Sequence, residues 1–138
     1  MGSESPLTER SVLIVEDDPL IRLELIDLFQ SVGARAIAAS TCDQAVEATA
    51  QYHICAALLD YMVGEDSVAQ LCRELSEYQI PYMFYTGYPD LEQVFPGAVI
   101  VEKPASGEAL IGCMTDLIVS SLPNRGRLRC KGPAAQQP

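Results

Sequence analysis

Apolar runs of strand length alternate with segments of helical period along most of this chain, and this alternation limits the possible folds more than any other feature. Strands that are apolar at nearly every position are expected at residues 11–16, 35–40, 54–60, 80–87 and 99–104. Helices are expected at residues 18–33, 41–52, 65–78 and 105–122. Pro89 and Pro96 bound the segment between the last two strands, so any helix there is expected to be short.

Five strands of this kind, separated by helices, predict an α/β protein of one domain. Strands that are apolar on both faces belong in a parallel sheet with helices covering both sides. The expected fold is flavodoxin-like, with strand order 2-1-3-4-5 and an abbreviated fourth helix. We place the domain at residues 11–122, between a flexible N-terminus (1–10) and a flexible tail (123–138) that is basic and contains proline. Ligands of such folds bind at the carboxyl ends of the strands, at the switch point between strands one and three.

The first two helices carry signals for their ends and their inner faces. Asp18 suits the N-cap of the first helix, Pro19 its first position and Gly33 its end. Its apolar residues form one wide stripe, which consists of Leu20, Leu23, Ile26, Leu28, Phe29 and Val32. The inner face of the second helix is expected to hold Cys42, Ala45, Val46 and Thr49.

The formal net charge of -10 is concentrated in the body of the chain. Residues 11–122 hold 17 Asp and Glu residues against four Lys and Arg, whereas four of the nine basic residues lie in the tail. An acidic body argues against nucleic acid as a partner, because phosphate contacts need clustered basic residues. No apolar run reaches the roughly 18 residues that cross a bilayer, so membrane insertion is not expected. The five cysteines are odd in number and lack a C-x-x-C pair, which favours reduced thiols in the cytoplasm.

Charged and polar side chains stand where four of the five strands end. Glu16 and Asp17 follow the first strand, Asp60 ends the third, and Thr86 and Lys103 end the fourth and fifth. Clustered carboxylates repel each other, and a hard divalent cation such as Mg²⁺ (or Mn²⁺), which prefers oxygen ligands, removes that repulsion. An ionised Asp60 between the cation and Lys103 can attack a phosphorus centre, while Thr86 hydrogen-bonds a phosphoryl oxygen.

Each of these residues also has a simpler explanation. An acid after a strand is often a helix cap, as we expect for Asp18, and Asp60 alone is an ordinary acid at a strand end. Thr86 with Gly87 alone is a turn, and Lys103 alone is uninformative. Only a shared site explains why all of them fall at the same end of the predicted sheet.

Four short segments, "LIVEDDP", "ALLD", "YTG" and "VEKP", occur in this order, and together they resemble the receiver domain of two-component response regulators over residues 11–122. The resemblance implies that Asp60 is the phosphoacceptor. It also implies that Asp17 is a direct Mg²⁺ ligand, that Glu16 binds the cation through water, and that Met62 supplies a backbone carbonyl. The family's switch hydroxyl and its lysine correspond to Thr86 and Lys103.

Three departures from the family pattern concern its switch. The position three residues before the family's lysine is usually aromatic and is Ile100 here, and the usual Ala after the switch hydroxyl is Gly87. Only 17 positions separate the switch hydroxyl from the lysine, which again indicates an abbreviated fourth helix. The segment "FYTGY" resembles the FAT GUY subgroup of receivers, with Tyr85 in place of Ala and Tyr88 one position early. We therefore expect output to pass through the loop around Tyr88 or through the packing of Ile100.

The resemblance implies a response regulator that receives its phosphoryl group from a sensor histidine kinase or a histidine phosphotransfer protein. It would then bind a downstream target or pass the group on, through the first helix and the loop after the fifth strand. About 16 residues follow the last helix, so a stand-alone receiver is expected. No enzymatic activity is expected beyond Mg²⁺-dependent phosphorylation and dephosphorylation of Asp60.

Two other functions are consistent with parts of the pattern. The alternative is a receiver-like interaction module that signals without phosphorylation, although such a module usually lacks one of the acidic, hydroxyl or lysine residues. A metal-dependent phosphatase is disfavoured, because that class typically needs a further acid two residues after the nucleophile, where this chain has Met62.

Overall fold

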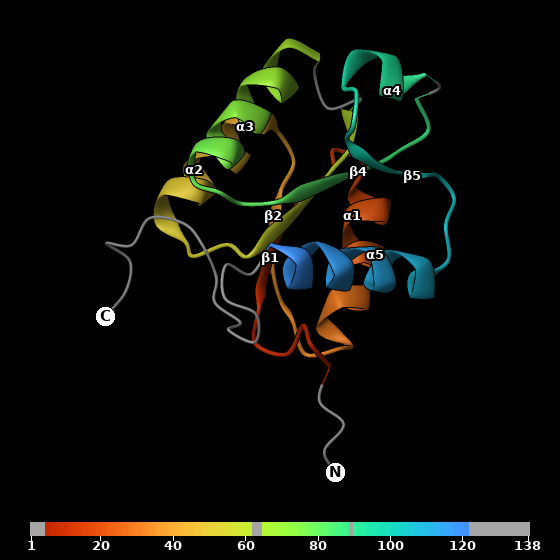
Figure 1. Ribbon diagram of the computed structural model, residues 1–138. Coiled ribbons are helices and arrows are strands. Elements are labelled where there is room, and N and C mark those ends of the chain that lie inside the picture. Colours follow the sequence, from red (N-terminus) through yellow and green to blue (C-terminus); the bar gives the residue numbers. More distant parts are fainter. Residues whose placement is uncertain (1–4, 62–64, 89, 122–138) are drawn as a thin grey trace.

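Strands and helices alternate along the chain in the computed structural model, which describes residues 5–61, 65–88 and 90–121 (Figure 1). The strands are β1 (Ser11–Val15), β2 (Arg35–Ala39), β3 (Ala56–Leu59), β4 (Tyr82–Thr86) and β5 (Val99–Glu102). The helices are α1 (Pro19–Gln30), α2 (Cys42–Gln51), α3 (Glu65–Glu77), α4 (Leu91–Val94) and α5 (Gly107–Ser120). The predicted tail lies outside the described residues, and so does Met62.

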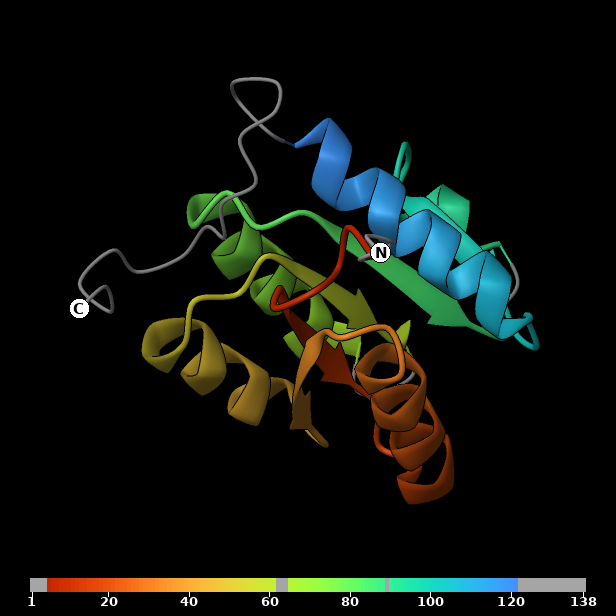
Figure 2. The ribbon, with the colours of Figure 1, turned by 90° about the horizontal axis from the view of Figure 1, so that it is seen from below.

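The five strands form one parallel sheet in the order β2-β1-β3-β4-β5, which confirms the predicted fold class. Helices α1 and α5 cover one face of the sheet, and α2 and α3 cover the other (Figure 2). In the register of β1 and β3, Val15 lies opposite Leu59. The next residues, Glu16 and Asp60, therefore leave the two strands side by side at their carboxyl ends.

Each face of the sheet has its own apolar core. Leu13 and Phe84 point toward α2 and α3, where they pack with Leu71 and Leu75. The other core contains the following side chains of α1 and α5: Leu25, Phe29, Leu110, Met114 and Ile118. Strands buried on both sides explain why the sequence shows continuous apolar runs rather than alternation.

The N-terminus of α1 is built as predicted, but its inner face differs from the predicted stripe. The carboxylate of Asp18 accepts hydrogen bonds from the backbone N–H groups of Leu20 and Ile21, and Pro19 occupies the first turn. Leu20 and Leu23 are exposed, and the buried residues of the helix are Leu25 and Phe29, one turn apart. The rest of the stripe is confirmed, since Ile26, Leu28 and Val32 are partly buried against the core. It was wrong at Leu20 and Leu23 because α1 is apolar around much of its circumference, so periodicity alone did not select the face.

Helix α2 and the cysteines also depart in part from expectation. The buried residues of α2 are Cys42, Ala45, Ala48 and Thr49, whereas Val46 is only half-buried.

Cys42, Cys72 and Cys113 are free thiols, but Cys55 is disulfide-bonded, so the expectation of reduced cysteines is wrong for this residue. A disulfide depends on which thiols meet in space, and sequence spacing does not report that.

Helix α4 has only four residues, as the short spacing between β4 and β5 predicted. Asp90, which precedes it, has a positive φ of 65° and makes no side-chain cap. Within the described ranges, no helix combines the length and the apolar character needed to cross a bilayer.

Candidate functional site

Three carboxylates meet at the carboxyl ends of β1 and β3. Glu16 and Asp60 are buried, with 1% and 4% of their surface exposed, whereas Asp17 is open to solvent. One oxygen from each of the three lies within 4.8 Å of the others, and this is the group of potential metal ligands found among the described residues. The sequence predicted this meeting because parallel strands end at the same edge of a sheet.

Lys103 joins these carboxylates from the end of β5. Its Nζ lies 3.1 Å from Glu16 Oε1 and 3.1 Å from Asp60 Oδ2, so one ammonium binds both buried acids. Burial raises the pKa of Glu16, and the hydrogen bond from Lys103 only partly opposes that effect. Burial lowers the pKa of Lys103, but hydrogen bonds to Glu16 and Asp60 outweigh it, so this pKa is raised overall and the ammonium keeps its charge.

Hydrogen bonds with the backbone hold Glu16 and Asp60 at the ends of β1 and β3. The N–H of Asp18 donates to Glu16 Oε2 at 3.2 Å, and Arg22 Nη1 donates to the carbonyl of Glu16 at 2.9 Å. The N–H of Asp60 donates to the carbonyl of Val15 at 3.1 Å, which ties the two strand ends together. Asp18 caps α1, so its carboxylate is already engaged, while Asp17 is left free of that role.

Thr86 is fully buried at the end of β4. Its backbone carbonyl accepts a hydrogen bond from the N–H of Lys103 at 3.0 Å, which places the ends of β4 and β5 next to each other. Its hydroxyl oxygen accepts a hydrogen bond from the N–H of Tyr88 at 3.2 Å. The same hydroxyl still has its own proton to donate. Thr86 is therefore linked to the loop before α4 at the same edge of the sheet as the acids.

Tyr88 and Ile100, which were expected to carry the signal, lie next to α4. Aromatic rings that the sequence analysis did not single out pack beside Tyr88. The ring of Tyr61, directly after Asp60, lies 4.8 Å from that of Tyr88 and 5.9 Å from that of Phe95. The ring of Phe95 also lies 5.0 Å from that of Phe84. Tyr61 and Phe95 could have been noticed only as aromatic residues near motif positions, because their mutual contact depends on the fold.

Ile100 and Gly87 occupy less constrained positions. Ile100 is half-buried and lines a hollow of about 460 Å³ together with Tyr88, Leu91, Ala98 and three acids, which are Asp90, Glu92 and Glu102. Gly87 is exposed, and a side chain at this position would enter open space. Gly87 is thus not required by packing, whereas Ile100 touches the core.

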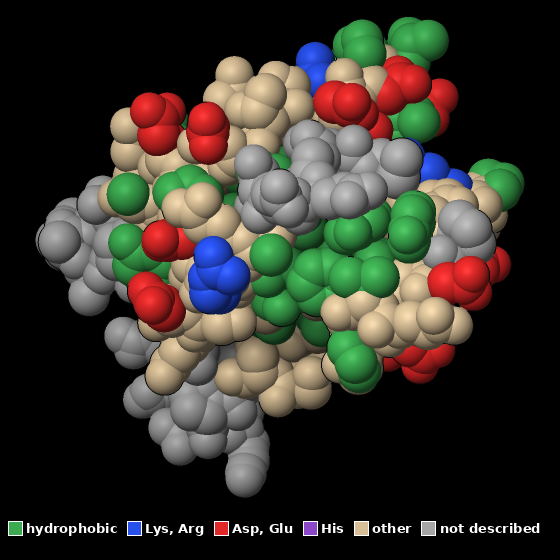
Figure 3. Space-filling model, turned by 90° about the horizontal axis from the view of Figure 1, so that it is seen from above, with side chains coloured by type: hydrophobic (Ala, Val, Ile, Leu, Met, Phe, Trp, Pro, Cys, Tyr) green, Lys and Arg blue, Asp and Glu red, His purple; other side chains and the backbone are tan. Residues whose placement is uncertain are grey.

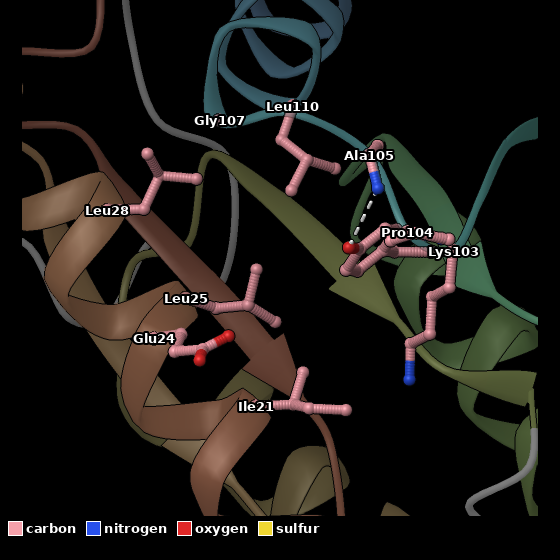
Figure 4. Close-up of a pocket in the computed structure, with 10 residues that line it drawn as sticks. Ile21, Glu24, Leu25, Leu28, Lys103, Pro104, Ala105, Gly107 and Leu110 are labelled. Carbon is pink, nitrogen blue, oxygen red and sulfur yellow. Dashed lines mark hydrogen bonds between the residues drawn. The ribbon is translucent and has the colours of Figure 1, made fainter.

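A second hollow, of about 450 Å³, opens between α1 and the segment that joins β5 to α5 (Figure 4). Ile21, Leu25 and Leu28 approach it from α1, and Leu110 faces them from α5. Lys103 stands at its edge, so the hollow borders the carboxylate site. Viewed from above, hydrophobic side chains gather near the middle of this end of the molecule, with acidic side chains around them (Figure 3).

The donor set fits a hard divalent cation. All three candidate ligands are carboxylates, one of them exposed enough for a hydrated ion to approach, and oxygen ligands with remaining water are what Mg²⁺ prefers. Lys103 compensates part of the negative charge of Glu16 and Asp60 but does not contact every carboxylate oxygen that the site offers. The arrangement can therefore bind a cation and an anionic oxygen group at neighbouring positions.

No protein-family model and no curated protein sequence matches this chain. Solved structures do match: a response regulator receiver protein from Sinorhizobium medicae is 21% identical, with a TM-score of 0.71 over 83% of this chain and 98% of that one. A CheY-like response regulator receiver domain protein from Methanospirillum hungatei is 22% identical, with a TM-score of 0.71 over 79% and 93% of the two chains.

A third match comes from a histidine kinase. The receiver domain of a sensor histidine kinase from Pseudomonas aeruginosa is 18% identical, with a TM-score of 0.71 over 80% of this chain and 98% of that one, and its structure holds a magnesium ion in the active-site cleft. At these identities the likeness concerns the fold, and this chain has the CheY-like fold of response regulator receiver domains.

Proposed function

We propose that this protein is a response regulator that accepts a phosphoryl group on Asp60. A carboxylate oxygen of Asp60 attacks the phosphorus atom, the bond between phosphorus and the donor breaks, and the donor leaves with the electron pair. One observation carries the proposal: Lys103 Nζ lies 3.1 Å from both Asp60 and Glu16, at an edge where Asp17 is open to solvent. An ammonium at this position can stabilise charge on the oxygens of the transferred group.

Asp17, Glu16 and Asp60 are the residues that would hold Mg²⁺ (or Mn²⁺), with the backbone carbonyl of Met62 as a further ligand that the resemblance implies. When bound, the cation neutralises charge on the phosphoryl oxygens. The protein's own contribution is to orient Asp60. Lys103 and the backbone contact to Val15 supply that orientation.

We further propose that Thr86 reports phosphorylation to the loop before α4. Its hydroxyl can donate to a phosphoryl oxygen, and a turn of the side chain toward that group would weaken its contact with the N–H of Tyr88. Tyr88 packs against Tyr61, so the change would reach the rings around α4. Ile100 on β5 lines the same hollow as Tyr88, so a movement of Tyr88 would change the packing of Ile100.

The proposed donor is a phosphohistidine of a sensor histidine kinase or of a histidine phosphotransfer protein. The contact surface would be α1 and the loop after β5, next to Asp60. Leu20 and Leu23 on α1 are 73% and 55% exposed, although large apolar side chains normally avoid solvent. A downstream target is proposed at the other side of the site, around Tyr88 and α4.

The alternative is a module of the same fold that binds partners without being phosphorylated. The full set of Glu16, Asp17, Asp60, Thr86 and Lys103 disfavours it, because none of these residues is needed for binding alone. Membership of the FAT GUY subgroup is also a proposal, which the segment "FYTGY" supports. No catalytic activity toward other substrates is proposed.

Phosphorylation is tested by incubating the protein with acetyl phosphate and Mg²⁺ and weighing the intact chain. We expect the wild type to gain one phosphoryl group, and Asp60→Asn to gain none. Asp116→Asn, an exposed acid on α5, is the matched control and should be labelled like the wild type. A wild type that stays at its original mass in the presence of Mg²⁺ would refute the proposed phosphoacceptor, and equal labelling of Asp60→Asn would place the phosphoryl group elsewhere.

A further inference from the structure

We propose that Tyr85 is a positioning residue for Lys103: its hydroxyl anchors the turn after Lys103, and its ring supports the ammonium. Tyr85 lies on β4, one residue before Thr86, and is 8% exposed. The expected effect on phosphoryl transfer rests on the proposed function. The contact between Tyr85 and the lysine segment stands on the geometry alone.

The hydroxyl of Tyr85 makes the first contact. It accepts a hydrogen bond from the backbone N–H of Ala105 at 3.2 Å, two residues beyond Lys103 (Figure 4, dashed line). The peptide bond between Lys103 and Pro104, which lies between these two residues, is cis. On the other side of Lys103, its own N–H donates to the carbonyl of Thr86 at 3.0 Å. The backbone of Lys103 is thus held from both sides by consecutive residues of β4.

The ring of Tyr85 makes the second contact. Lys103 Nζ lies 5.6 Å from the ring centroid, within the range in which an ammonium is attracted to an aromatic face. Nζ also lies 3.1 Å from each of the two carboxylates, so the ammonium contacts Glu16 and Asp60 and lies over the ring as well. A lysine side chain has four flexible methylene groups, and such lateral support limits the positions it can occupy.

The location of Tyr85 also fits a supporting role. Neighbouring residues of a strand point to opposite faces of the sheet, so Phe84 joins the core under α2 and α3 while Tyr85 joins the core under α1 and α5. There Tyr85 forms one wall of the hollow that Leu25 and Leu110 also line. A smaller residue at this position would leave Lys103 next to an enlarged hollow, with room to turn away from Asp60.

Two substitutions separate the two contacts. Tyr85→Phe removes the hydroxyl and keeps the ring, and we expect it to slow labelling of Asp60 by acetyl phosphate about threefold to tenfold. Tyr85→Leu removes both contacts and is expected to slow labelling about tenfold to a hundredfold. Tyr82→Phe makes the same chemical change on the same strand, where the hydroxyl contacts Cys72 and Ser76, and should leave the rate unchanged.

A merely structural role for Tyr85 would give a different pattern. Positioning predicts a lower labelling rate at saturating Mg²⁺ in both variants, because Asp17 and the other acids are untouched. It also predicts the rate order wild type, Tyr85→Phe, Tyr85→Leu. Loss of folded protein would instead lower the labelled fraction of the whole sample without changing the rate of the folded part, and thermal unfolding of each variant measures that fraction.

NMR of the lysine side chain provides a measurement that does not depend on phosphorylation. The ring of Tyr85 should shift the Hε protons of Lys103 upfield in the wild type and in Tyr85→Phe, and this shift should vanish in Tyr85→Leu. Lys103→Arg assigns the signal. If the wild type is not labelled, the proposed phosphoacceptor function fails, whereas the positioning of Lys103 is still decided by this spectrum. An unchanged Lys103 signal in folded Tyr85→Leu, or a wild-type labelling rate in that variant, would overturn the inference.

Discussion

Replacing Lys103 with methionine tests the central ion pairs of the site. Methionine keeps much of the length of the side chain and removes the charge, so Glu16 and Asp60 remain buried without the cation 3.1 Å away. Removing one partner of a buried ion pair typically destabilises a protein by about 3–5 kcal/mol. The side chain of Lys103 is 21% exposed, which allows some screening, so we expect a loss of about 2–4 kcal/mol.

Thermal unfolding followed by circular dichroism in EDTA at pH 7.5 measures this loss. For a domain of this size the expected change corresponds to a lowering of Tm by about 10 °C. Arg73→Met removes an exposed cation from α3 and serves as the control, with a change of about 0.5 kcal/mol or less. Adding Mg²⁺ should recover part of the stability of Lys103→Met, because the cation replaces the missing positive charge among the carboxylates.

The pH dependence of Tm tests independently whether Lys103 stabilises the buried carboxylates. The pKa of Glu16 is already raised by burial, and losing the hydrogen bond from Lys103 should raise it further. A carboxyl group whose folded pKa exceeds its unfolded value contributes most stability when protonated and loses that contribution as pH rises through the folded pKa. The difference in Tm between wild type and Lys103→Met should therefore widen from about pH 5 to pH 8. An equal Tm for the two proteins across this range would refute the view that Lys103 stabilises the buried carboxylates.

Three further predictions concern the acids and the aromatic rings. Asp17→Asn should abolish Mg²⁺-dependent labelling of Asp60, whereas Asp18→Asn should change labelling little, because Asn caps a helix about as well as Asp. Intact mass after acetyl phosphate treatment distinguishes the two variants. Equal loss of labelling in both would contradict the assignment of Asp17 to the cation and Asp18 to the helix cap. Glu16→Gln should raise Tm in EDTA at pH 7.5, because it replaces a buried carboxylate with a neutral side chain, and burial raises the pKa of this carboxyl group. A lowered Tm would contradict this reasoning. Phe95→Leu should lower the free energy of unfolding by about 1 kcal/mol, measured by urea unfolding, because it removes the ring contacts with Tyr61 and Phe84. No measurable change would mean that these ring contacts do not stabilise the region of α4.

The order of the sheet, the short fourth helix and the edge that carries the site could all be predicted from the amino-acid sequence. The strand order was the usual one for the flavodoxin-like class that the elements indicate. The elements and the short helix follow from local properties: apolar runs of strand length, helical period between them, and polar residues where the runs end. Asp18 was predicted as the cap of α1 for the same reason, because a cap binds backbone groups two and three residues away. The parallel arrangement then places Glu16, Asp60 and Lys103 at a common edge.

Only the tertiary structure decided which groups make contact within that arrangement. Lys103 was expected next to Asp60, but its contact with Glu16 was not predicted. Its ammonium lies 3.1 Å from both carboxylates, across 43 and 87 positions of the chain. Tyr85 looked like a simple replacement in a motif, yet it contacts the segment of Lys103 twice, through its hydroxyl and through its ring. The inner face of α1 was likewise decided by packing. Periodicity describes one element at a time, whereas side-chain contacts depend on how two elements pack together.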